Sequence, residues 1–241
     1  MALLPDVSQV WRRDPPWAAI YTAGVANEPI ARVAGRLFWG TDVRLLYRAT
    51  AVIGEQPDGA AILDIPCGGG IALRGLRRAQ QVRYVAADIS DAMLERTQRE
   101  AERRGVRDIV ELRRADVEAL PFADGEFDLC VSFTGLHCFP HPHRAVLELG
   151  RVVRPGGRLS ASALLTDAGV RYKPPLAVAR VARLMGPSAS GPELEQWLGE
   201  AGFRDVELVR SGALGYVTAR RAGRRKPRSD ALGSSSRTTA R

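Results

Sequence analysis

Short apolar runs alternate with longer segments of helical periodicity along most of this chain. The runs occupy residues 60–65, 82–89, 109–116, 127–133, 157–165, 203–209 and 212–220. Between them, residues 71–80, 91–105, 143–154 and 192–202 repeat apolar side chains at helical spacing. This order predicts an α/β fold, in which a mainly parallel sheet is covered by helices on both faces. Ligands of such sheets bind at the carboxyl ends of the strands.

Two segments lie outside this alternation. Residues 30–54 have the periodicity of one or two amphipathic helices, and residues 170–192 hold one helical segment between proline and glycine turns. We therefore predict an N-terminal helical cap over residues 1–54 and a main domain over residues 55–219, with a lid-like insertion at 166–192. Both additions are expected to cover the ligand crevice.

The turn after the first strand is rich in glycine. Residues 61–76 read AILDIPCGGGIALRGL, an apolar strand that ends in Asp64, then a glycine turn, then a helical segment that starts near Ile71. Glycines have no Cβ, so the backbone of this turn can approach a ligand closely. The free N–H groups of a helix that starts here would point at the same place. The segment therefore predicts a nucleotide-type binding loop.

Three positions narrow the choice of ligand. A dinucleotide site has the pattern GxGxxG, but Leu73 stands where the third glycine would be. Asp64 would repel a pyrophosphate, whereas it could hold the ammonium group of a methionine moiety. Asp88 ends the second strand, where a carboxylate accepts the hydroxyls of a ribose. Asp64 therefore favours a cationic amino-acid ligand, whereas Asp88 fits either this ligand or a dinucleotide.

From Ala60 to Leu165 the chain resembles the class I S-adenosylmethionine (SAM)-dependent methyltransferase superfamily, and within it the UbiE-like, type 11 group. The similarity is carried, in the family's order, by LDIPCGGG, AADIS, RRADVEALPFADGEFDLCVSF and RVVRPGGRL. The resemblance implies a Rossmann-like sheet of seven strands, mostly parallel with an antiparallel last strand. It also implies that S-adenosyl-L-methionine is the methyl donor and that the acceptor is a small molecule.

The same resemblance implies roles for particular residues. The methionine end of the donor would be lined by Asp64, Cys67, Gly68 and Gly70. The ribose and adenine would contact Asp88 and Ile89, and the adenine edge would contact Asp116 and Val117. Phe133, at the end of the fourth strand, would also contact the donor. Pro66 departs from the family pattern, which has a glycine there. Proline lacks an N–H and fixes φ, so this position must have a negative φ.

The reaction implied is a direct in-line displacement, which requires little of the protein beyond holding two reactants together. His137, just past the fourth strand, is the one candidate general base. A hydrogen-bonding or packing role for His137 is the alternative. Apolar candidates to line the acceptor pocket are Phe38, Trp39, Tyr47, Phe139, Tyr172 and Met185.

Two further patterns suggest other chemistry and are disfavoured by their context. Residues 14–17 read DPPW, as in adenine-N6 methyltransferases, but no buried strand precedes them and the fourth strand is in its unpermuted place. All three histidines lie at His137, His141 and His143, between prolines and with no second ligand cluster, so we predict no metal site.

The formal net charge of +8 is concentrated at the C-terminus. Eight basic residues and one acid lie between Arg220 and Arg241, in a segment rich in Ser, Gly and Thr. We predict a disordered basic tail over residues 220–241 rather than a nucleic-acid tether. Two alternatives to a small-molecule methyltransferase stay open. The basic tail leaves a nucleic-acid methyltransferase, and the glycine turn leaves an NAD-dependent or non-catalytic nucleotide-binding protein.

Location and redox state are also predicted. No stretch approaches the roughly 20 apolar residues of a membrane span, and residues 1–17 lack a signal-peptide pattern. The chain has an odd number of cysteines, Cys67, Cys130 and Cys138, which suits reduced thiols rather than disulfides. We expect a cytoplasmic protein, and no feature of the sequence selects an oligomeric state or a particular acceptor.

Overall fold

The structure, a computed structural model, describes residues 10–11, 24, 27–181 and 185–223. Seven strands form one sheet in the order β3-β2-β1-β4-β5-β7-β6. Their bounds are β1 Ala61–Asp64, β2 Arg83–Asp88, β3 Val110–Arg114, β4 Phe127–Phe133, β5 Val153–Leu164, β6 Phe203–Ser211 and β7 Leu214–Arg221. Strands β1 to β5 pair in parallel, and β7 is antiparallel to both of its neighbours. The predicted mostly parallel sheet with an antiparallel last strand is confirmed.

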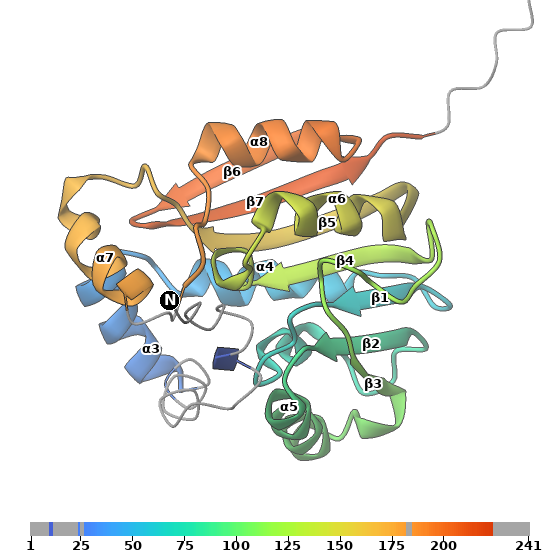
Figure 1. Ribbon diagram of the computed structural model, residues 1–241. Coiled ribbons are helices and arrows are strands. Elements are labelled where there is room, and N and C mark those ends of the chain that lie inside the picture. The colour runs from blue at the N-terminus through green and yellow to red at the C-terminus, as the bar shows by residue number, and fades with distance from the viewer. Residues whose placement is uncertain (1–9, 12–23, 25–26, 182–184, 224–241) are drawn as a thin grey trace, which may run out of the picture.

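Helices cover both faces of the sheet (Figure 1). Helices α6 (Pro142–Val152) and α8 (Gly191–Glu200) pack on one face, where Leu149 and Leu198 join a core cluster with Leu63 of β1. Helices α4 (Arg44–Gly54) and α5 (Asp91–Arg104) contribute to the cluster on the other face, which contains Ile62. Neighbouring residues of a strand point to opposite faces, so β1 supplies both cores.

The predicted helix ends follow from their capping residues. The Ser90 side chain caps the start of α5, and Gly105 ends it in the left-handed conformation. Helix α8 begins with a capping box between Ser190 and Glu193. These local signals explain why both helices lie where their sequences predict.

The first predicted crossover helix, over residues 71–80, is wrong in length. Only Ile71–Gly75 is helical, as a short 3₁₀ helix (η2), and Leu76 is already extended. A Cβ on Gly75 would collide with the Thr50 carbonyl of α4. Helix α4 therefore covers this part of the sheet face, and a longer crossover helix has no room there.

The two segments outside the alternation are helical, as predicted. The N-terminal segment forms α3 (Glu28–Ala34), a π-helical turn η1 (Gly35–Trp39) and α4. The later segment forms η5 (Val170–Tyr172) and α7 (Lys173–Val181). Figure 1 shows α3 and α7 near each other, beyond the carboxyl ends of the parallel strands. Two shorter 3₁₀ helices, η3 (Arg107–Ile109) and η4 (Leu136–Cys138), complete the described elements.

Several features of the sequence fall outside the described residues. Asp14–Trp17 lies there, as does the tail from residue 224 onward. Arg220 and Arg221, which we assigned to the tail, are the last residues of β7, because they pair with Arg158 and Phe203. Within the described part of the chain, the helices are all too short or too polar to cross a membrane.

Candidate functional site

One cavity opens at the carboxyl ends of β1, β2, β3 and β4. The sheet register explains its position, since parallel strands end at the same edge and their following loops meet there. The lining comes from the glycine turn, from the ends of β2, β3 and β4, and from the loop that precedes α6. These residues are Ile65 to Ile71, Asp88, Ile89, Ala115 to Val117, Phe133, Thr134 and Cys138 to Pro140. Trp11, Arg74, Met93, Glu100 and Arg104 complete it.

The structure brings together eight of the nine residues predicted to hold the donor. They are Cys67, Gly68, Gly70, Asp88, Ile89, Asp116, Val117 and Phe133. The ninth, Asp64, is not part of the lining. These residues come from four separate strand ends, so their meeting is a property of the sheet topology.

The glycine turn is held in shape by its neighbours. Gly68 and Gly70 have φ of 53° and 81°, a conformation that side chains disfavour. The Gly68 N–H donates to Asp88 Oδ2 at 2.9 Å, and its carbonyl accepts from the Thr97 hydroxyl of α5 at 2.9 Å. Strand β2 and helix α5 thus fix both sides of this peptide. Thr97 is fully buried.

Asp88 is a buried carboxylate at the cavity wall. Its Oδ1 accepts from the Ser90 N–H at 3.0 Å, and its Oδ2 from Gly68. Burial raises the pKa of Asp88 to about 6, although the backbone N–H groups of Ser90 and Gly68 oppose that rise. Each carboxylate oxygen has two acceptor positions, so capacity for ligand hydroxyls remains.

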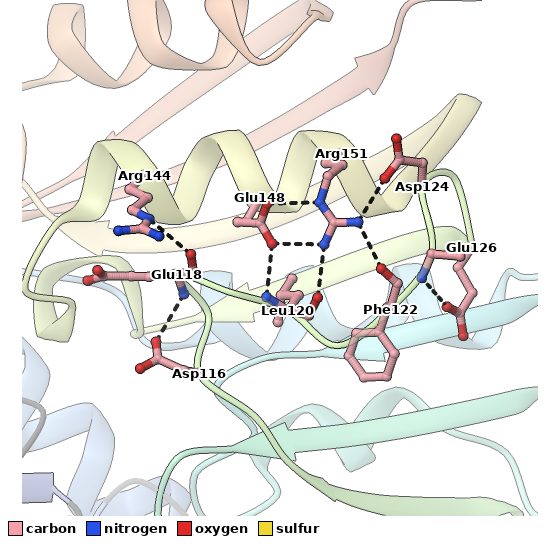
Figure 2. Close-up of polar contacts among 10 residues, drawn as sticks. Asp116, Glu118, Leu120, Phe122, Asp124, Glu126, Arg144, Glu148 and Arg151 are labelled. Atoms are coloured by element: carbon pink, nitrogen blue, oxygen red, sulfur yellow. Dashed lines mark hydrogen bonds and ion pairs between the residues drawn. The ribbon is translucent and has the colours of Figure 1, made fainter.

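The segment after β3 carries Asp116 and Val117 and is fastened to α6 (Figure 2). Arg151 donates to the carbonyls of Leu120 and Phe122 at 2.9 and 2.8 Å, and Glu148 accepts from the Leu120 N–H at 2.9 Å. Burial is only partial for this pair, yet the hydrogen bond with Glu148 raises the pKa of Arg151 well above its usual range. Arg151 and Glu148 therefore set the path of the segment after β3.

The end of β4 has an unusual backbone. Thr134 has φ of 56°, which is rare for a β-branched residue, and it lines the cavity. Its N–H donates to the Ser162 carbonyl at 3.1 Å and to the Ser162 hydroxyl at 3.0 Å. The next residue, Gly135, packs so closely on Pro66 that a Cβ there would collide with the proline ring. Strained residues of this kind cluster at functional sites.

Asp64 lies behind the cavity wall. Its Oδ2 accepts from the Tyr84 hydroxyl at 2.8 Å, and its side chain shares a sheet face with Ile62. Burial raises the pKa of Asp64 to about 8, which the Tyr84 hydrogen bond lowers and the nearby Asp88 carboxylate raises further. The carboxyl group of Asp64 is thus held by Tyr84 behind the wall, and its contact with a ligand ammonium stays a prediction.

His137 is buried away from the cavity lining. Its Nδ1 accepts a hydrogen bond from the Leu164 N–H at 3.2 Å, so the proton of the neutral ring is on Nε2. Burial lowers the pKa of His137 to about 4. A ring in this state has no free lone pair and little basicity, so the geometry favours the hydrogen-bonding alternative. The general-base role stays a prediction.

The three histidines have separate partners. His141 Nδ1 lies 2.8 Å from Glu118, and His143 Nε2 lies 2.7 Å from Glu200. Among the described residues, no three His, Cys, Asp or Glu side chains gather as a metal site would require. Imidazoles with different partners do not form one ligand set.

Several lining residues were missed from the sequence. Trp11, Arg74, Glu100 and Arg104 face the cavity, and Glu100 forms ion pairs with Arg103 and Arg104 at 2.7 and 2.6 Å. The spacing of Glu100 and Arg104 on α5 indicates a helix-surface pair, and nothing in it points to a cavity. Of the apolar acceptor-pocket candidates, Phe139 lines this cavity.

Comparisons with known proteins identify the family of this chain. A family model described as "Methyltransferase domain" matches residues 63–161. An O-methyltransferase, rstn1, from Aspergillus nomiae is 31% identical over 67% of this chain and 73% of its own length. Demethylmenaquinone methyltransferase from Thermus thermophilus is 40% identical over 51% of this chain, and the match spans 55% of that relative, about half its length.

The fold is shared with solved structures of low sequence identity. The [4+2]-cyclase SpnF superposes with a TM-score of 0.67 at 17% identity, over 91% of this chain and 98% of that one. This likeness supports the architecture alone, because one fold can hold different reactions.

Proposed function

Because this chain belongs to the type 11 group of the class I SAM-dependent methyltransferases, we propose that it transfers a methyl group from SAM to a small-molecule acceptor. The observation that carries the proposal is the gathering of eight family-motif residues around one cavity, with the Asp88 carboxylate beside the glycine turn. One of the relatives is named for a small molecule, demethylmenaquinone, which favours such an acceptor over nucleic acid.

The residues present fit the donor. The Gly68–Gly70 turn has no side chains to block a methionine moiety, and Asp88 retains acceptor capacity for ribose hydroxyls. Ile89 and Val117 give apolar surface for an adenine ring, and Asp116 gives a polar edge. Asp88 and Asp116 place two carboxyl groups in the cavity wall, which suits a cationic ligand, whereas Glu100 is already paired with Arg104.

When bound, SAM would supply an electrophilic methyl carbon for direct in-line displacement by the acceptor atom, with S-adenosylhomocysteine as the leaving product. The chain's contribution is to orient: Asp88, the glycine turn and Phe133 hold one side of the cavity in fixed geometry. The apolar side chains Ile65, Met93 and Phe139 exclude water, which favours a reaction in which charge is dispersed. The general-base role of His137 stays a prediction, which the hydrogen bond from the Leu164 N–H to its Nδ1 disfavours.

The test is calorimetric titration of the full chain with S-adenosylhomocysteine and, separately, with NAD. We expect micromolar binding of S-adenosylhomocysteine, weakened at least about tenfold by Asp88→Ala, with no NAD binding. Asp108→Ala is the matched control, because Asp108 is an exposed acid on η3 outside the cavity lining. Binding of NAD alone would contradict the proposal and support the dehydrogenase alternative.

The nucleic-acid alternative has its own test. Phosphate contacts make affinity fall steeply with salt, so removal of residues 224–241 should abolish any such binding and its salt dependence. We expect the truncated chain to bind S-adenosylhomocysteine as the full chain does. If truncation instead removes methyl transfer to RNA or DNA that the full chain performs, the small-molecule acceptor is wrong.

A further inference from the structure

A second hollow lies where the two segments outside the sheet meet. It is lined by residues of α3 and η1, of the loop after η1, and of η5. We call it the arginine groove, defined by Arg32, Arg36, Arg171 and Tyr172 together with their neighbours Glu28 and Asp42. Its walls come from residues more than 120 positions apart, so it exists only in the folded chain.

The arginine groove holds positive charge that the described residues do not neutralise. Arg44, also in its lining, is paired with Asp42, to which its Nε donates at 3.0 Å. Within the described ranges, Arg32, Arg36 and Arg171 have no carboxylate partner, although Arg171 lies over the Tyr172 ring at 4.8 Å. Three guanidinium groups around one hollow attract an anion, because each presents several N–H donors in a planar fork.

The walls of the arginine groove are held in place. The Ala213 N–H donates to the Trp39 carbonyl at 2.7 Å, and the Asp42 N–H donates to the Ser211 hydroxyl at 3.0 Å. Tyr172 is buried, and Gly40 packs directly on its hydroxyl. The cap is thus fastened to the β6–β7 turn and to η5, which gives the arginines a common scaffold.

The arginine groove adjoins the donor cavity. Glu28 lines the groove and Arg74 lines the cavity, and the two side chains form an ion pair at 3.4 Å. Arg74 also lies over the Tyr47 ring, 4.2 Å from its centre. This ion pair uses the charge of Glu28, so it leaves the arginine groove more positive and marks the boundary between the two hollows.

We propose that the arginine groove binds an oxyanion group, a carboxylate or a phosphate, of the methyl acceptor. The proposal rests on the proposed methyltransferase function and specifies its substrate class. The anionic end of the acceptor lies among Arg32, Arg36 and Arg171, and the atom to be methylated extends past the Glu28–Arg74 pair toward the donor cavity.

The experiment is titration of the full chain, first saturated with S-adenosylhomocysteine, with inorganic pyrophosphate and with citrate in separate runs. Because S-adenosylhomocysteine then occupies the donor cavity, any binding of pyrophosphate or citrate takes place outside that cavity. Binding of either probe should weaken about tenfold or more in the double variant Arg32→Gln/Arg36→Gln, and several-fold in Arg171→Gln. Arg204→Gln, which changes an exposed arginine on β6 outside the groove lining, should bind as wild type does.

The outcomes separate the two proposals. Pyrophosphate binding that depends on Arg32 and Arg36 identifies a phosphate-type acceptor, and citrate binding identifies a carboxylate-type one. No binding of either probe, or an equal loss in Arg204→Gln, overturns the arginine groove as an anion site. The same titrations report S-adenosylhomocysteine affinity, which the groove variants should leave unchanged. Failure of wild type to bind S-adenosylhomocysteine would instead count against the methyltransferase function.

Discussion

Arg151 Nη2 lies 2.9 Å from the carbonyl oxygen of Leu120, and this contact fastens the segment after β3 to helix α6 (Figure 2). Replacing Arg151 by Met should remove its bonds to Leu120, Phe122 and Glu148 while keeping the apolar stem. We expect the free energy of unfolding to fall by about 2–4 kcal/mol and the affinity for S-adenosylhomocysteine to fall with it. Urea unfolding and calorimetry measure both. Arg99→Met is the control, because its exposed pair with Glu95 at 3.9 Å contributes little.

Thr97→Val tests how α5 holds the glycine turn. The variant keeps the shape of the buried side chain but removes the hydroxyl that donates to the Gly68 carbonyl. We expect a loss of about 1–3 kcal/mol in unfolding free energy and weaker S-adenosylhomocysteine binding, because the Gly68 peptide loses a partner. Thr97→Ser, which retains the hydroxyl, should keep most of the affinity. If the two variants bind equally weakly, packing rather than the hydrogen bond positions the turn.

Binding of S-adenosylhomocysteine should depend on pH through Asp88. Burial raises the pKa of Asp88 to about 6, and only the carboxylate form can accept from two ribose hydroxyls while bonded to Gly68 and Ser90. We expect the affinity to fall by up to about tenfold per pH unit below pH 6. The same raised pKa makes the folded state hold its proton more tightly, so this group's contribution to stability decreases as pH rises from its unfolded value toward 6.

The measurement is the dissociation constant at several pH values between 5 and 7.5. Asp88→Asn should bind more weakly at pH 7.5 and show a flatter dependence, since the amide does not titrate. A wild-type affinity that stays constant over this range would show that Asp88 does not act through its charge.

His137 should affect the pH dependence of stability. Burial lowers its pKa from 6.5 to about 4, so its contribution to stability is full above the unfolded value of 6.5 and is lost as pH falls toward 4. In His137→Asn, an amide oxygen can replace Nδ1 as the acceptor for Leu164 but does not titrate. Between pH 7.5 and 4.5, wild type should lose about 2–3 kcal/mol more unfolding free energy than the variant. Parallel losses would mean that His137 is accessible to protons in the folded state.

Two glycine-to-alanine variants should have opposite effects. A Cβ at Gly75 would meet the Thr50 carbonyl, so Gly75→Ala must displace α4 from η2, and we expect a loss of roughly 2–4 kcal/mol. Gly199, in α8, has open space around its Cβ position, and Gly199→Ala should stabilise by about 0.5–1 kcal/mol. Thermal and urea unfolding compare them. A Gly75→Ala variant as stable as wild type would show that the close approach is not required.

Local sequence signals predicted most of the elements around the site. Short apolar runs located the strands, and the capping residues Ser90 and Gly105 located the ends of α5. Both signals depend only on residues that are neighbours in the chain. The same kind of signal failed at Gly75, where a helical pattern was cut short by contact with α4. Propensity sets a local preference that tertiary packing can override.

By itself, the sequence determined the order of the motifs along the chain, the glycine turn after β1 and the acid at the end of β2. Each of these depends on residues that are close together in the chain. Only the tertiary structure decided that Asp64 lies beside Tyr84 rather than in the cavity, and that His137 bonds to Leu164. It alone brought Arg36 and Arg171 to one hollow. These relationships join segments far apart in sequence, and their geometry follows from sheet register and packing, which no local periodicity encodes.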